Sequence, residues 1–162
     1  MIKGLHHNAY RCRDSEETRR FYEDFLGLPL ACTLEINETM TGRKTSTLHT
    51  FYEMGDGSYL AFFEAPDMAF DFKRQHDYDL HIALEVDEQQ LAPMMAKGKA
   101  RGIETRGVSD HGFIHSIYFR DPNGYVIELT AKTPSHAEAT DPARNAAYAK
   151  LERWQAAKKQ PA

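Results

Sequence analysis

The feature that most constrains the fold is an internal repeat, because the same order of predicted elements occurs twice along the chain. Hydrophobic spacing and turn residues predict a first copy with a strand at 4–13, a helix at 15–26, and strands at 29–36, 45–54 and 58–64. The second copy has a strand at 80–86, a helix that ends by 102, and strands at 103–108, 115–120 and 125–131. We therefore predict an α+β fold of paired βαβββ modules, at about 1–66 and 78–133, that form one domain, 1–133.

Local signals support the boundaries of these elements. Asp14 is followed by Ser-Glu-Glu, an N-cap pattern, and Gly27 offers the left-handed stop that ends a helix. Residues 87–90 repeat the cap signal at the start of the second helix. Residues 65–79 have no clear period and are interpreted as a linker. Asp141-Pro142 predicts the start of a helix that runs to about residue 158, within a C-terminal tail at 134–162.

Aligning the two copies brings chemically unusual residues into register. His7 matches His81 on the first strand of each copy, and Ala61 matches Glu128 on the last strand. Glu128 lies in an apolar run after the Asp-Pro-Asn-Gly turn at 121–124, so its carboxylate must be paired, hydrogen-bonded or bound to a metal. Two imidazoles and one carboxylate form a facial triad that leaves metal positions open for substrate. The alternative is that each histidine is an ordinary half-buried strand residue and Glu128 faces solvent.

Composition limits the class of partner. The formal net charge of −4 gives no reason to expect nucleic acid or an anionic membrane. No apolar run approaches the roughly 18 residues of a membrane helix, and the N-terminus has no signal-peptide region. We interpret Cys12 and Cys32 as free thiols, which predicts a cytoplasmic protein. The 8 histidines are a first indication of metal chemistry.

These residues carry a family resemblance over about residues 1–133. The chain resembles the vicinal oxygen chelate superfamily, which contains glyoxalase I, fosfomycin-resistance thiol transferases, methylmalonyl-CoA epimerases and extradiol dioxygenases. The resemblance rests on the His7 strand that leads into Asp14, the helix that ends in Leu26-Gly27, residues 80–83, and the 121–124 turn that precedes Glu128. It implies a U-shaped barrel of mixed β-sheet around one divalent metal, with His7, His81 and Glu128 as ligands. We also expect a homodimer, with the stripe of Ala147, Leu151 and Trp154 docked on the domain or on a second subunit.

The fourth ligand position separates members of this superfamily. Glyoxalase I and the epimerases use four metal ligands, the fourth from the strand that here holds Ala61, which cannot ligate. Glu64 is three residues further on, so strand alternation points it to the opposite sheet face unless the register slips. The sequence therefore favours a three-ligand member, either an extradiol dioxygenase or a fosfomycin-type transferase.

The signature of extradiol dioxygenases is matched by His111, Ile117, Tyr118, Asp121, Pro122, Gly124 and Glu128, with Ser109 as a departure. The favoured reading is therefore an Fe(II) enzyme of aromatic catabolism that cleaves a catechol-type ring with O2, with Mn(II), Zn(II) or Ni(II) as alternative metals. His111 or His115 would act as acid–base and Tyr118 as hydrogen-bond donor, while His76 or His49 could replace a further family histidine. The alternatives are a glyoxalase I-like lyase, a fosfomycin-type thiol transferase or a drug-binding protein of the same fold.

Overall fold

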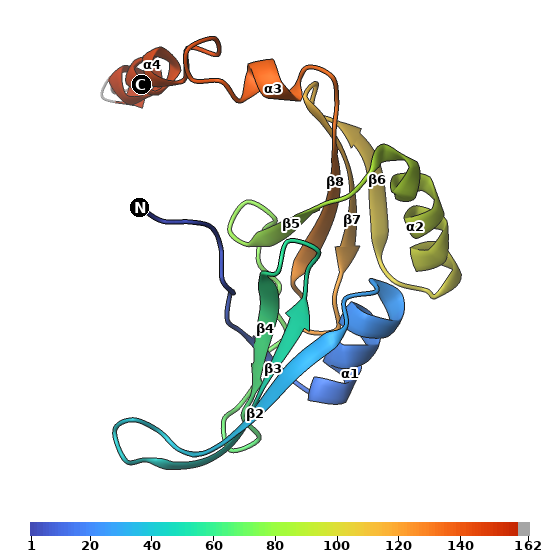
Figure 1. Cartoon of the computed structure of the whole chain (residues 1–162), viewed down its shortest axis with the longest axis vertical. Coiled ribbons are helices and arrows are strands. Elements are labelled where there is room, and N and C mark those ends of the chain that lie inside the picture. The colour runs from blue at the N-terminus through green and yellow to red at the C-terminus, as the bar shows by residue number, and fades with distance from the viewer. Residues whose placement is uncertain (159–162) are drawn as a thin grey trace.

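The computed structural model describes residues 1–158, which contain two four-stranded sheets (Figure 1). The first sheet contains β1 (Tyr10–Cys12), β2 (Leu30–Glu38), β3 (Lys44–Glu53) and β4 (Tyr59–Glu64), in the order β1-β4-β3-β2. The second contains β5 (His81–Glu85), β6 (Thr105–Asp110), β7 (Ile114–Arg120) and β8 (Val126–Lys132), in the equivalent order β5-β8-β7-β6. In both sheets the first strand is parallel to the last, and the other neighbours are antiparallel. The predicted α+β fold of paired βαβββ modules is confirmed.

The helices cover one side of this pair of sheets. The predicted first helix is α1 (Ser15–Arg19), which continues as the π-helical segment η1 (Arg20–Phe25), and the second is α2 (Glu88–Ala100). Both lie on the same side of the sheets, whereas α3 (His136–Ala139) and α4 (Ala147–Lys158) form an arm that extends toward the other side (Figure 1). The predicted caps are confirmed: the Asp14 carboxylate accepts from the Glu17 amide at 2.8 Å, and the Asp87 amide donates to Gln90 Oε1 at 3.1 Å.

Two predicted boundaries are wrong. The first strand is shorter than 4–13: only Tyr10–Cys12 is a regular strand, with an isolated bridge between His7 and Tyr59, because this edge of the sheet has a single neighbour. The tail helix begins at Ala147 rather than after Pro142, because residues 142–144 form a turn and Ala146 has a left-handed conformation with φ of +53°. Residues 159–162 of the predicted tail lie outside the described residues.

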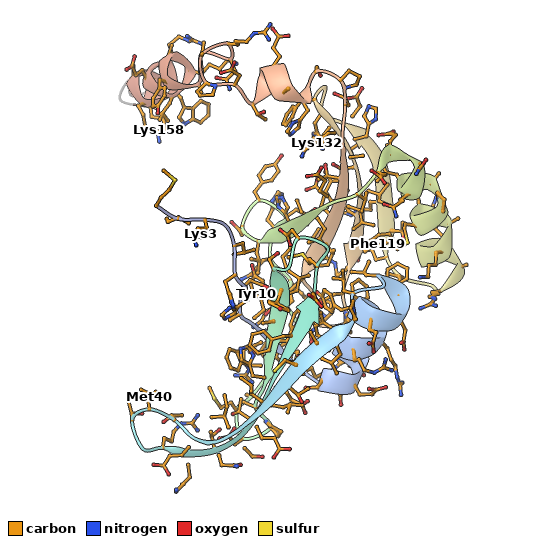
Figure 2. All side chains as sticks on the ribbon, in the orientation of Figure 1. Lys3, Tyr10, Met40, Phe119, Lys132 and Lys158 are labelled. Atoms are coloured by element: carbon orange, nitrogen blue, oxygen red, sulfur yellow. The ribbon has the colours of Figure 1, made fainter. Side chains whose placement is uncertain are left out.

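One hydrophobic core joins the two modules. Strand alternation directs one face of each sheet toward α1, η1 and α2, and fully buried side chains from both modules meet there, including Tyr22, Phe25, Phe62, Phe119 and Ile127. Figure 2 shows side chains crowded between the sheets and the helices, including Phe119, while the α3–α4 arm stands apart from them. The opposite face of each sheet, which we call the open face, is not covered by α1 or α2.

The turn at 121–124 also connects the modules. The buried Asp121 carboxylate accepts from the Tyr22 hydroxyl at 3.0 Å, and Asn123 Oδ1 accepts from the Arg13 amide at 2.8 Å. Gly124 has a φ of +95°, and a Cβ there would lie 2.6 Å from backbone atoms of Lys73, so the linker requires glycine at this point. The second module is therefore held to the first helix through buried hydrogen bonds.

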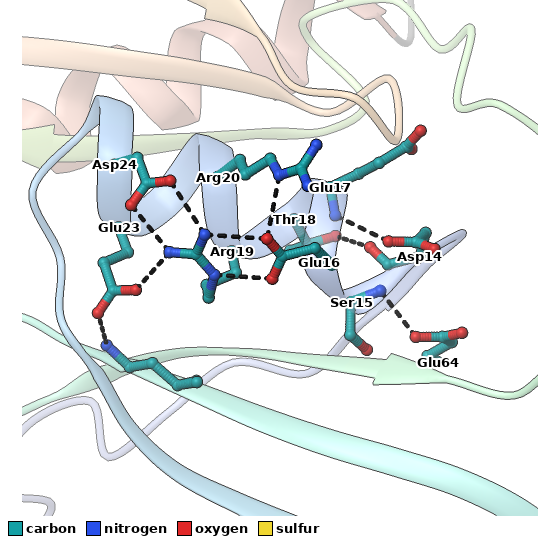
Figure 3. Close-up of polar contacts among 11 residues, drawn as sticks. Asp14, Ser15, Glu16, Glu17, Thr18, Arg19, Arg20, Glu23, Asp24 and Glu64 are labelled. Carbon is teal, nitrogen blue, oxygen red and sulfur yellow. Dashed lines mark hydrogen bonds and ion pairs between the residues drawn. The ribbon is translucent and has the colours of Figure 1, made fainter.

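On the helix surface, Arg19 is surrounded by three carboxylates (Figure 3). It pairs with Glu16 at 2.8 Å, Glu23 at 2.7 Å and Asp24 at 2.8 Å, and Glu23 also accepts from the Leu30 amide at 3.1 Å. Bonds from Arg19 and Arg20 lower the pKa of Glu16 to about 2. The cluster links the helix to the start of β2.

Two further expectations concern the whole chain. Cys12, which is buried, and Cys32, which is exposed, are both free thiols as predicted, and burial raises the pKa of Cys12 to about 11. Within residues 1–158, no helix combines the length and the apolar character needed to cross a membrane.

Candidate metal centre

The centre of the candidate site is a pair formed by His81 and Glu128 on adjacent parallel strands. His81 is aligned with Val126 and Ala83 with Glu128, so the two side chains share the open face of the second sheet. His81 Nε2 lies 3.3 Å from Glu128 Oε2. Glu128 is 5% exposed, so its carboxylate, in an otherwise apolar strand, needs a charged or hydrogen-bonded partner.

The hydrogen bonds of His81 define what can lie between this pair. Its Nδ1 is 2.7 Å from the backbone carbonyl oxygen of Asp77, which can only accept, so Nδ1 carries the proton. In the neutral ring, Nε2 then presents a lone pair to the Glu128 carboxylate, and two acceptors at 3.3 Å require a proton or a cation between them. A histidine whose Nδ1–H is held by a carbonyl is the usual arrangement of a metal ligand. The donor set therefore fits a divalent metal.

The segment before β5 is held in place by ion pairs of Asp77. Its carboxylate accepts from Arg106 at 2.5 Å and lies 3.9 Å from Arg120. The Arg106 guanidinium also lies 5.4 Å from the centre of the Tyr118 ring. The sequence did not reveal that Asp77 holds this segment in place. Asp77 lies in the linker, where neither a hydrophobic period nor a motif distinguishes it from the neighbouring charged residues.

Tyr118 and His111 are brought to the same place. Tyr118 is aligned with Glu128 across the β7–β8 pair, and its hydroxyl donates to Glu128 Oε1 at 3.4 Å. His111 Nε2 lies 2.9 Å from the same hydroxyl. Burial, followed by the charge of Glu128, raises the pKa of Tyr118, so the phenol keeps its proton at neutral pH. The three groups form a continuous chain from solvent to the Glu128 carboxylate.

His7 occupies the equivalent position in the first module but does not join the pair. His7 bridges Tyr59 in the first sheet, and His81 is aligned with Val126 in the second. Tyr59 lies two residues before Ala61, and Val126 two residues before Glu128, so the strand register makes His7 equivalent to His81 and Ala61 equivalent to Glu128, as predicted. The His7 ring packs edge-on against Phe51 at 5.4 Å, and its Nδ1 lies 2.7 Å from Nδ1 of His6. No group of three potential metal ligands occurs within residues 1–158.

The remaining candidates lie elsewhere. Glu64 accepts a hydrogen bond from the Ser15 amide at 2.7 Å, so its carboxylate caps α1 on the helix-covered side (Figure 3). His115 lies on the same side as the buried Ile117 and Phe119, and its Nδ1 is 2.9 Å from Glu88 of α2, a contact that raises its pKa. The structure therefore does not bring His115 to Glu128. The alternation of His115 with those two core residues could have predicted this placement.

Two histidines considered as substitutes also differ in position. His76 receives a hydrogen bond from the Tyr78 amide at 3.1 Å within the linker. His49 lies on the open face of the first sheet, is 6% exposed, and has its Nδ1 at 3.0 Å from the carbonyl of Phe62. Burial lowers the pKa of His49. The His49 ring lies beside the His7 ring, with 6.2 Å between the ring centres.

The two modules, each with the same strand order and one open sheet face, define the class as a paired βαβββ protein. The family model Glyoxalase/Bleomycin resistance protein/Dioxygenase superfamily matches residues 4–129, and the chain belongs to this family.

Individual relatives are more distant. The chain is 28% identical over 157 residues to metallothiol transferase FosB of Shouchella clausii, which covers 88% of this chain and 92% of the relative. It is 29% identical over 133 residues to a probable lactoylglutathione lyase of Vibrio cholerae, with 81% and 92% covered. The crystal structure of the fosfomycin resistance protein FosX of Listeria monocytogenes with Mn(II) and sulfate has a TM-score of 0.63 at 22% identity and covers 85% of this chain and 98% of that one. These relatives are transferases, lyases and resistance proteins, and none of the three is a dioxygenase.

Proposed function

We propose that this protein is a divalent-metal enzyme whose site forms between two copies of the chain, with His7 of one copy and His81 and Glu128 of the other. The observation that carries the proposal is the His81–Glu128 pair, in which two acceptors face each other at 3.3 Å. His7 lies on the open face of the other sheet and forms no three-residue ligand group with this pair within residues 1–158. Both open faces are left uncovered by α1 and α2 (Figure 1). A two-fold dimer would bring the first module of each copy against the second module of its partner and would form two such sites.

The reaction that fits best is the addition of a thiol to a small electrophile, as in a fosfomycin-type metallothiol transferase. The metallothiol transferase FosB is similar over 92% of its length, and Ala61, at the position equivalent to Glu128, leaves a three-ligand set with open positions. Mn(II) is the metal we favour, because it is present in the structure of FosX and because a carboxylate ligand such as Glu128 suits it.

The chemistry divides between the metal and the side chains. A divalent ion in this site would polarise the oxygen of a bound epoxide. As the thiol sulfur forms its bond to carbon, the carbon–oxygen bond breaks, and the thiol proton ends on the released oxygen. Tyr118 holds a proton beside Glu128, and His111, which touches the same hydroxyl, can exchange that proton with solvent.

One observation favours a second function, extradiol ring cleavage with Fe(II) and O2. His111 and Tyr118, two residues of that signature, are within 2.9 Å of each other and in line with Glu128. A catechol bound at the metal would place one of its hydroxyl groups near these hydrogen-bonded side chains, where His111 can remove a proton.

A panel of reactions separates these functions. The Mn(II)-loaded protein with glutathione or cysteine should consume an epoxide, tested with fosfomycin, propylene oxide and styrene oxide. Thiol-independent, O2-dependent formation of a yellow product from catechol by the Fe(II)-loaded protein would favour the dioxygenase instead. Isomerisation of the methylglyoxal–glutathione hemithioacetal would indicate a lyase, and inactivity in all three assays would overturn the proposal.

The shared site is tested by complementation. His7→Ala and His81→Ala should each abolish tight Mn(II) binding, because three ligands leave no reserve. If the two variants are unfolded together and refolded as a mixture, mixed dimers should regain one complete site each, or about a quarter of the wild-type sites in total. A mixture that binds no more Mn(II) than either variant would show that the site does not lie between copies.

A further inference from the structure

The open face of the first sheet carries an aromatic surface next to His7. His49 is aligned with Phe63, and Phe51 with Ala61, across the β3–β4 pair, so these side chains emerge on the same face. The alternate residues of β4, Leu60 and Phe62, are buried in the core on the other face. We call His49, Phe51, Tyr59 and Phe63 the aromatic wall.

Ring contacts make this wall continuous and rigid. His49 is stacked on Phe63 with 3.6 Å between ring centres and 10° between planes, and it lies 4.2 Å from Phe51. Phe51 in turn contacts Tyr59 at 6.1 Å and the His7 ring at 5.4 Å. The bond from His49 Nδ1 to a backbone carbonyl fixes the central ring. A flat ligand bound beside His7 would therefore meet a preformed aromatic surface.

The second module does not repeat this surface. Strand register places Tyr118 at the position of Phe51, Ser116 at that of His49, and Thr130 at that of Phe63. Its open face therefore supplies hydroxyl groups and the Glu128 carboxylate, whereas the first module supplies rings. In a site built from both faces, one side would hold the reacting oxygen and the other would hold the body of the substrate.

Charge on these faces argues against a doubly negative substrate. Arg11 is aligned with Phe63 on the first open face, and its Nη2 donates to the carbonyl oxygens of Met68 at 3.2 Å and Ala65 at 3.4 Å. Its Nε has no hydrogen-bond partner within residues 1–158 but is buried, so the guanidinium is only partly available to a ligand. On the second face, Arg106 is bound to the Asp77 carboxylate. A phosphonate would need charge-assisted donors that are not already engaged.

We propose that the substrate is an uncharged aryl epoxide rather than a phosphonate, and that its ring stacks on the aromatic wall. This inference rests on the proposed thiol transfer and names the substrate of the same site. The thiol sulfur bonds to an epoxide carbon, that carbon's bond to oxygen breaks, and the thiol proton moves to the oxygen, so no oxidant or reductant is needed.

Two neutral epoxides that differ by the ring provide the test. With glutathione and Mn(II), kcat/KM for styrene oxide should exceed that for propylene oxide by at least about tenfold, and fosfomycin should be the poorest of the three. Phe51→Leu and Phe63→Leu should each lower kcat/KM for styrene oxide by about three- to tenfold, the usual worth of a stacked ring. Each wall variant should lower kcat/KM for styrene oxide by more than it lowers kcat/KM for propylene oxide, because only styrene oxide carries a ring that can stack on the wall. Phe72→Leu, which alters an exposed linker ring, is the matched control.

A binding measurement separates failure of this inference from failure of the proposed reaction. Calorimetry should find that 1-phenyl-1,2-ethanediol binds the wild type more tightly than 1,2-propanediol does, and that the two wall variants lose this preference while Phe72→Leu keeps it. If no epoxide reacts but this preference is found, the aromatic site stands and the thiol-transfer reaction does not. Preference for fosfomycin, or wall variants with unchanged phenyl-diol binding, would overturn the inference.

Discussion

The buried contact between Tyr22 and Asp121 allows a sharp test of how the two modules are held together. The Asp121 carboxylate is 2% exposed and accepts four hydrogen bonds, from Tyr22 Oη, from the amide and side chain of Asn123, and from the Tyr125 amide. Tyr22→Phe removes one donor from a buried anion and leaves the rest of the ring in place. Because hydrogen bonds to charged groups contribute about 1.5–3 kcal/mol, we expect a loss of about 2 kcal/mol in the free energy of unfolding.

Tyr52→Phe is the matched control. Tyr52 is as fully buried as Tyr22, and the ring centres are 5.5 Å apart, but its hydroxyl has no hydrogen-bond partner within residues 1–158. Removing that hydroxyl should leave stability unchanged or raise it, because the folded state then no longer buries an unsatisfied polar group.

Urea unfolding followed by circular dichroism, at fixed protein concentration and neutral pH, measures both variants. A loss of about 2 kcal/mol in Tyr22→Phe corresponds to a melting temperature roughly 4–8 °C lower for a chain of this size. Equal effects of the two substitutions, or a Tyr22→Phe protein within about 0.5 kcal/mol of wild type, would refute the reasoning.

The pH dependence has a defined sign. Burial raises the pKa of Asp121 above its ordinary value of 3.8, and the hydrogen bonds from Asn123, Tyr125 and Tyr22 oppose that rise. A raised pKa in the folded state means that ionisation of Asp121 costs stability at neutral pH and that this cost disappears below 3.8. Because Tyr22→Phe raises the pKa further, its deficit relative to wild type should shrink as the pH falls toward 3.8.

Three further predictions concern charges outside this contact. Because hydrogen bonds from Arg19 and then Arg20 lower the pKa of Glu16 to about 2, the stability from these contacts is present above the ordinary value of 4.5 and is lost as the pH falls toward 2. The free energy of unfolding of Arg19→Met should therefore fall less than that of wild type when the pH is lowered from above 4.5 toward 2, as measured by urea unfolding at both ends of this range. An equal fall in the two proteins would contradict this prediction. Ala61→Glu should hold or raise Mn(II) affinity while turnover falls, because a fourth carboxylate fills a position that substrate needs. Glu64→Ala should leave Mn(II) affinity unchanged and lower only stability, and a metal-free Glu64→Ala protein would show that the register is misassigned.

Much of the fold could be predicted from the sequence, because its signals are local. The Asp14 cap, the Gly27 stop and the turn at 121–124 depend on neighbouring residues, and all three are present as predicted. The repeat also fixed which residues are equivalent, so the match of His7 with His81 follows from the strand register. Period and turn chemistry carry this information without any long-range contact.

Only the tertiary structure decided where equivalent residues lie in space. Glu64 caps α1 and His115 meets Glu88, because each side chain follows the sheet face that packs against the helices. The pair of His81 with Glu128 depends on Asp77, a linker residue whose carbonyl orients the imidazole only once the loop has docked. His7 lies on a different open face from that pair, a separation set by how two sheets pack around one core. Sequence determines the strands and their faces through local steric and hydrogen-bonding rules, whereas the distance between two faces depends on the packing of the whole chain.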